Sequence, residues 1–200
     1  LNNILIPGVL QLMIFLVTVF SIGSEIKFGT SPEWLKTGNN SLLVSLAGKL
    51  LPHTVLFSIV GFLSCSILYG FNAFPLQSGW MPMLTDMFLL VLASQAVGIF
   101  MIGVLPTLRL GLSFASLFGM ITFSIVGLSF PVADMHPTLQ ALANLFPLRH
   151  YFLIYVDQAL NGRDLIYCFG HYLALMAFLI LPFLIGRNLK HALLYFRYIP

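Results

Sequence analysis

The sequence predicts an all-α protein that crosses a membrane several times, and three observations indicate this fold class. Hydrophobic residues make up 59% of the 200 residues and charged residues only 8%, whereas soluble domains contain about 45–50% apolar and about 25% charged residues. The mean hydropathy is +0.99. The apolar residues also gather in runs of about 20, the length that a helix needs to span a bilayer. We expect one membrane domain with about five transmembrane helices, a short cytoplasmic helix and an external re-entrant or interfacial hairpin.

Prolines, glycines and charged residues separate the five expected helices. Pro7 and Pro52 lie near helix starts, where a proline is tolerated in the first turn. In the fourth helix Gly111, Ala115 and Gly119 recur at every fourth residue, which lets another helix approach closely. We therefore expect this helix to pack tightly on a neighbour. The expected helices are residues 4–23, 50–69, 83–105, 110–130 and 165–186.

The segment 131–164 differs from the five apolar runs. It contains prolines, charges and amphipathic pieces that are too short or too polar to cross a bilayer alone. Such pieces are typical of a re-entrant or interfacial hairpin at the membrane surface.

The distribution of Lys and Arg predicts the orientation in the membrane. Cytoplasmic loops carry an excess of these residues. We therefore expect the loop 24–49 and the C-terminus in the cytoplasm, the N-terminus outside, and at least one further helix before Leu1. Arg149 and Arg163 fall on the outer side, while seven basic residues fall on the inner side, namely Lys27, Lys36, Lys49, Arg109, Arg187, Lys190 and Arg197.

The loop 24–49 contains the signals of a short helix. Ser31 is a good N-cap, Pro32 suits the first helical position and Glu33 complements the positive end of the helix dipole. Gly38 suits the stop at the other end. The tryptophan and leucine between them give this helix apolar side chains to bury, against lipid headgroups or in a protein groove.

Two groups of motifs, one in this loop and one in segment 131–164, follow the order found in a known family. The first group is Glu25, Gly29-Thr30, Glu33 to Leu35, Gly48-Lys49 and Leu51-Pro52. The second group is Phe130-Pro131, Met135, Pro137, Leu145 to Leu148, Tyr151 and Asn161-Gly162. In these motifs the chain resembles the permease subunits of type-2 (ABC-2 type) ABC exporters, from the family's second helix to its C-terminus.

The resemblance implies a half-transporter in a bacterial inner or plasma membrane. It would form a homo- or heterodimer, bind ABC ATPase subunits or domains and export a substrate by alternating access. The family's first helix and any external domain would precede Leu1, a periplasmic adaptor is a further candidate partner, and no nucleic-acid partner is expected. The short helix would be the coupling helix, and its expected ATPase-contact residues are Glu25, Gly29, Thr30, Glu33, Trp34, Leu35 and Lys36.

The chain lacks a phosphate-binding loop of its own. Gly48-Lys49 is followed by Leu50, and Leu43 stands where the pattern requires its first glycine. We therefore expect no catalytic site, no metal site and no bound cofactor here, with ATP and Mg²⁺ held by the partner ATPase.

In the resembling family the equivalents of helices 4–23 and 110–130 line the transport path. Ordinary helix packing is the alternative role for the residues concerned. A path rich in phenylalanine would suit amphipathic drugs or lipid-like substrates. The candidate path residues are Gln11, Phe15, Thr18, Thr122 and Phe123.

Two other function classes compete with the permease. An intramembrane enzyme needs a buried catalytic pair, yet His171 is the only histidine well inside an expected helix and no serine motif accompanies it. A secondary transporter or channel usually places ionisable groups near the midplane, whereas the expected helix centres contain no Asp, Glu, Lys or Arg.

Several isolated polar residues have structural interpretations. We expect Asp86 to face lipid headgroups at the start of its helix, and we expect His136 and His150, like His171, to be structural or interfacial. Cys65 and Cys168 fall inside apolar runs, where a thiol behaves as a small buried hydrophobe.

Overall fold

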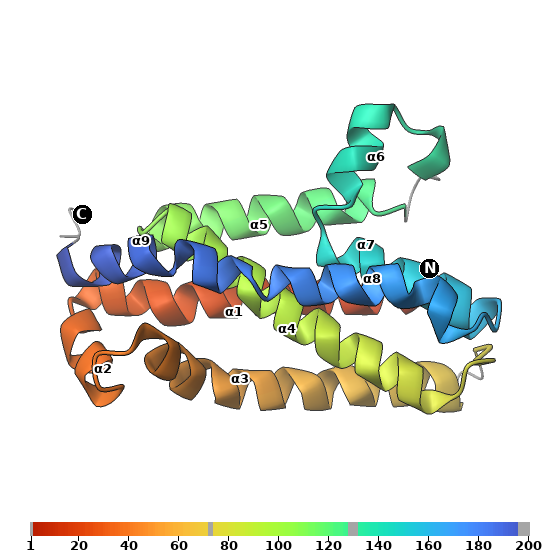
Figure 1. Ribbon diagram of the computed structural model, residues 1–200, viewed down its shortest axis with the longest axis horizontal. Helices are drawn as coiled ribbons and strands as arrows, with labels where there is room; N and C mark the ends of the chain where they lie inside the picture. The colour runs from red at the N-terminus through yellow and green to blue at the C-terminus, as the bar shows by residue number, and fades with distance from the viewer. Residues whose placement is uncertain (1, 72–73, 128–131, 196–200) are drawn as a thin grey trace.

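The computed structural model describes residues 2–71, 74–127 and 132–195 and consists of helices in these ranges (Figure 1). Five spans in them are long and apolar enough to cross a membrane, which confirms the predicted class. The elements are α1 (Asn2–Phe28), α2 (Ser31–Thr37), α3 (Leu42–Cys65), η1 (Ser66–Phe71), α4 (Trp80–Val104), α5 (Leu108–Ile125), η2 (Val132–Asp134), α6 (Pro137–Ala143), α7 (Pro147–Ile154), η3 (Tyr155–Leu160), α8 (Leu165–Phe178) and α9 (Leu181–Tyr195).

The central helix is α4, which packs against α1, α3, α8 and α9. Asp86 lies in its second turn and is fully buried, so the expectation that it faces lipid headgroups is wrong. Neither of its carboxyl oxygens has a hydrogen-bond partner among the described residues. Asp86 is buried because α3, α7 and α8 pack against α4 and cover its outer turns.

The small-residue face of α5 packs on α1, as predicted. Ala115 is fully buried. A Cβ atom on Gly111 would lie 3.0 Å from a methyl group of Val19, and one on Gly119 would overlap the side chain of Leu12. The absence of larger side chains therefore allows the two helices to come this close.

The helices on either side of the expected loop 24–49 extend into it. Helix α1 continues to Phe28 instead of residue 23, and α3 begins at Leu42 instead of residue 50. Leu42, Leu46 and Leu50 are buried at helical spacing, and this packing stabilises the early turns of α3. Pro52 consequently lies inside α3, where neighbouring helices in a membrane make a proline tolerable.

The last expected helix, 165–186, is divided into α8 and α9 by a turn at residues 179–180. Pro182 lacks an N–H, and its ring would collide with the carbonyl group of Phe178 in a continuous helix. Beyond the turn, α9 continues to Tyr195 and packs on α4.

Segment 131–164 contains η2, α6, α7 and η3, and α7 packs against α8, which follows this segment. The ring centroid of Phe146, at the start of α7, lies 4.5 Å from that of Phe118 in the middle of α5. The start of α7 therefore packs against the middle of α5. Phe130-Pro131 and the expected helical residues 128–130 lie outside the described residues, as does Arg197.

Candidate functional site

The candidate site is the region around α2, at the end of the bundle that also contains the α4–α5 turn and the end of α9 (Figure 1). The N-terminus and the α7–α8 turn lie at the opposite end. The loop therefore presents a separate short helix, Ser31–Thr37, as the sequence predicted.

The turn before α2 depends on a glycine. Gly29 has a φ of +71°, a left-handed conformation that favours glycine. The N–H of Thr30 donates to the carbonyl of Glu25 at 3.1 Å, which closes the end of α1 in a Schellman-type arrangement. The N-cap of α2 is Thr30 and not the expected Ser31, which is buried as the first helical residue.

The carboxylate of Glu25 joins α1 to both neighbouring segments. It accepts hydrogen bonds from the hydroxyl of Thr30 and from the ammonium group of Lys49, which lies in α3. The side chains of Glu25 and Lys49 are only 19% and 21% exposed. The Thr30 hydroxyl makes no capping hydrogen bond to α2.

Two side chains of α2 point back toward the membrane helices. The ammonium nitrogen of Lys49 lies 5.0 Å from the ring centroid of Trp34, within cation–π distance. Leu35 is 1% exposed and belongs to an apolar cluster with Ile22, Ile26 and Leu189. Leu35 therefore anchors α2 within this chain.

The turn after α2 is fixed by backbone conformation and by α9. Asn39 and Asn40 have φ values of 54° and 59°, and the N–H of Asn40 donates to the carbonyl of Leu35 at 2.9 Å. Gly38 is the C-cap, and a Cβ atom there would overlap Ser45 of α3. Lys190 of α9 donates to the carbonyl of Asn40 at 2.8 Å.

The outward face of α2 is polar and charged. The side chains of Glu33, Lys36 and Thr37 are exposed. Of the expected contact residues, Glu25 and Trp34 contact Lys49, and Thr30 contacts Glu25. Leu35 is buried, and Gly29, Glu33 and Lys36 are exposed. The arrangement can present a fixed polar surface to a partner.

Lys49 was not among the expected contact residues, although it links Glu25 with Trp34. A signal for it was present in the sequence. Glu25 and Lys49 have opposite charges and stand where two helices on the same side of the membrane meet one loop.

The candidate path residues lie at the interface of α1, α4 and α5. Gln11, Phe15, Thr18 and Thr122 are at most 2% exposed, and Phe123 is half-buried. The ring centroids of Phe15 and Phe118 are 5.8 Å apart, and a Cβ atom on Gly98 would lie 2.8 Å from the Cβ of Thr18. In this conformation the first four side chains are therefore enclosed by neighbouring helices.

The structure brings together two histidines that are 21 positions apart. His150 Nε2 donates to the carbonyl of Asn144 at 2.9 Å, since a carbonyl can only accept. In neutral His150, Nδ1 is then an acceptor, and His171 Nδ1 donates to it at 3.4 Å. Burial lowers the pKa of His150, the Asn144 carbonyl opposes this shift, and His171 and Arg149 add to it.

Other potential ligands remain dispersed. Cys65 and Cys168 are free and buried, as expected. Within the described ranges, no three His, Cys, Asp or Glu side chains converge in a way that could hold a metal ion.

Comparison with known proteins identifies a family for this chain. The family model for ABC-2 family transporter protein matches residues 1–187. No curated protein and no solved structure matches the chain. Since the match covers nearly the whole chain, the protein belongs to the ABC-2 family of transporter proteins.

Proposed function

We propose that the chain is the permease part of an ATP-driven exporter and that α2 is its coupling helix. The observation that carries this proposal is a short helix with an exposed polar face that is fixed to α1, α3 and α9. A partner that pushes on such a helix displaces several membrane helices together. ATP and Mg²⁺ would be bound by the ATPase, and the chain itself would transmit the movement.

The proposed ATPase contact divides into two sets of residues. Glu33 and Lys36, with their exposed side chains, would touch the ATPase directly. Glu25, Thr30, Trp34 and Leu35 would hold α2 in position, and Gly29 would permit the turn. This division goes beyond the sequence-based expectation, which treated all seven as contact residues.

We further propose that two permease subunits pair through α1 and α5, with the transport path between them. Phe114, Leu117 and Met120 form an exposed apolar stripe on α5 that would suit a second subunit. Phe123 would line the path at rest. Gln11, Phe15, Thr18 and Thr122 would reach it only when α1 and α5 separate during transport of an amphipathic substrate out of the cytoplasm.

The ATPase contact is tested by Glu33→Lys in the full-length protein reconstituted with its ATPase. Because this change reverses a charge on the exposed face of α2, we expect ATPase binding to weaken at least about tenfold, a loss of about 1.4 kcal/mol. Nucleotide-dependent transport should fall in parallel, while membrane insertion stays at the wild-type level. Trp34→Ala should also lower coupling, since it removes the contact with Lys49.

Arg109→Glu is the matched control, because Arg109 is an exposed cation at the same end of the bundle but outside α2. It should leave ATPase binding within about twofold of wild type, a change below about 0.5 kcal/mol, because Arg109 lies outside the proposed contact. Unchanged binding and transport in both Glu33→Lys and Trp34→Ala would remove α2 from the mechanism. Transport that needs no ATPase would instead favour a secondary transporter.

A further inference from the structure

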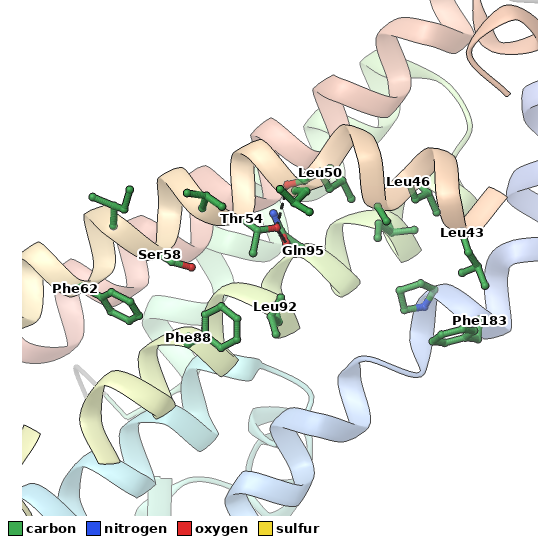
Figure 2. A pocket seen from close by; sticks show the side chains of 16 residues that line it. Leu43, Leu46, Leu50, Thr54, Ser58, Phe62, Phe88, Leu92, Gln95 and Phe183 are labelled. Atoms are coloured by element: carbon green, nitrogen blue, oxygen red, sulfur yellow. Dashed lines mark hydrogen bonds between the residues drawn. The ribbon is translucent and has the colours of Figure 1, made fainter. Parts of the chain in front are cut away.

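A long apolar groove runs along α3, with α3 on one side and α4 and α9 on the other (Figure 2). Its volume is about 710 Å³, within the roughly 300–1,000 Å³ of sites that hold drug-sized ligands. Leu43 and Phe62 mark its extent along α3, and Phe88 and Phe183 line the opposite wall. The groove therefore fits an extended apolar chain.

Two buried polar side chains, Gln95 and Ser58, and the half-buried Thr54 interrupt this apolar surface. The hydroxyl of Thr54 donates to Oε1 of Gln95 at 2.8 Å, drawn as the dashed line in Figure 2. The Nε2 group of Gln95 and the hydroxyl of Ser58 have no hydrogen-bond partner among the described residues. Both residues line the groove and are only 5% and 7% exposed.

The groove continues into a basic surface at the end of the bundle that contains α2. A second hollow of about 250 Å³ shares Leu43, Pro182 and Phe183 with it and is also lined by Arg187 and Lys190. The Arg187 side chain is exposed. Lys190 uses one N–H for the carbonyl of Asn40, and an ammonium group has three donors. Two cations thus stand at one end of an apolar groove, an arrangement complementary to an anionic lipid.

We propose that this groove binds one anionic phospholipid from the leaflet on the α2 side. The phosphate lies against Arg187 and Lys190, and one acyl chain follows α3 along the groove toward Phe62. The lipid fills the space between α3 and α9, and it is bound whether or not the chain contacts an ATPase.

The headgroup contact is tested with full-length protein reconstituted in equimolar phosphatidylglycerol and phosphatidylcholine. The protein is extracted in mild detergent, and native mass spectrometry measures the lipids that it retains. We expect phosphatidylglycerol to be enriched. Arg187→Gln and Lys190→Gln should each reduce the enrichment about fivefold, the effect of one basic residue near an anionic surface. Arg109→Gln, an exposed cation away from the groove, should leave it unchanged.

The groove contact is tested with Ala47→Trp. Ala47→Trp should lower retention by filling the groove that Ala47 lines. Thermal unfolding of each variant identifies any loss of folding. Equal retention of the two lipids by wild type, or an Arg109→Gln effect as large as that of Arg187→Gln, would overturn the proposal.

The position of the bound lipid can be measured on the wild-type protein. Phosphatidylglycerol with a photoreactive diazirine in its acyl chain should label peptides from 42–62 and 181–190 more strongly than peptides from α5, which has its own exposed apolar face. Uniform labelling of all helices would indicate ordinary annular lipid and contradict a specific site. A groove that stays unlabelled because another protein segment covers it would also contradict the proposal.

Discussion

At the scale of single residues, Glu25 and Lys49 form the connection between α1, α2 and α3. Their side chains are about four-fifths buried and also contact Thr30 and Trp34. Exposed ion pairs contribute about 0.2–1 kcal/mol, and partial burial with additional hydrogen bonds places this pair at the upper end of that range. Removing one partner should cost more than removing both, since the remaining charge is left without its partner.

A double-mutant cycle with Glu25→Gln and Lys49→Met measures the connection. We expect a coupling free energy of about 1 kcal/mol in thermal unfolding of the purified protein. High salt should reduce it only slightly, because the pair is largely shielded from solvent. Additive effects of the two substitutions would show that the ion pair does not stabilise the fold.

The shifted pKa of His150 should make the stability of the fold depend on pH. Burial lowers its pKa from the ordinary value of about 6.5, so the unfolded chain binds a proton before the folded chain does. Stability is therefore complete above about pH 6.5 and falls as the pH drops below that value. A second proton, on Nδ1 of His150, would point at the N–H of His171. It would also lie near the Arg149 cation.

The measurement is the unfolding temperature in detergent between pH 7.5 and pH 5.5. It should decrease toward low pH in wild type and less steeply in His150→Phe. His136→Gln provides the control, because His136 is exposed at the start of α6. If His150→Phe and wild type have the same pH dependence, another group is responsible.

At the scale of elements, the contact between α1 and α5 depends on side chains being small. Gly119→Leu should destabilise the fold by about 1–3 kcal/mol, because the new side chain overlaps Leu12. Gly170→Leu is the matched control: Gly170 lies in α8, and no atom lies within 4 Å of a Cβ built there. The two variants are compared by thermal unfolding. Equal loss of stability would mean that the α1–α5 contact has no special demand for small residues.

Local sequence signals predicted α2 almost to the residue, whereas contacts between elements decided what was missed. The proline, the acidic residue and Gly38 act within one or two turns, so they can be recognised without the fold. The burial of Asp86 depends on which helix is central, and the His150–His171 contact joins two elements. The early start of α3 depends on Leu42 packing against other helices. Composition and periodicity do not contain that information.

At the scale of the whole molecule, the positions of α2 and the α7–α8 turn at opposite ends predict opposite accessibility (Figure 1). Lys36→Cys and Asn161→Cys are introduced in a background in which Cys65 and Cys168 are replaced by alanine. Both chosen positions are exposed. A membrane-impermeant maleimide should label Asn161→Cys in intact cells and Lys36→Cys only after permeabilisation. The reverse pattern would invert the orientation inferred from Lys and Arg.

The attachment of α2 to long helices has a mechanical consequence. Helix α1 contains 27 residues, which corresponds to about 40 Å at a rise of 1.5 Å per residue. If α1 behaves as a stiff rod that pivots near α2, a tilt of about 5° moves its far end by about 3.5 Å, roughly the width of an atomic contact. In that case a small rotation of α1 beside α2 would become a larger displacement at its opposite end.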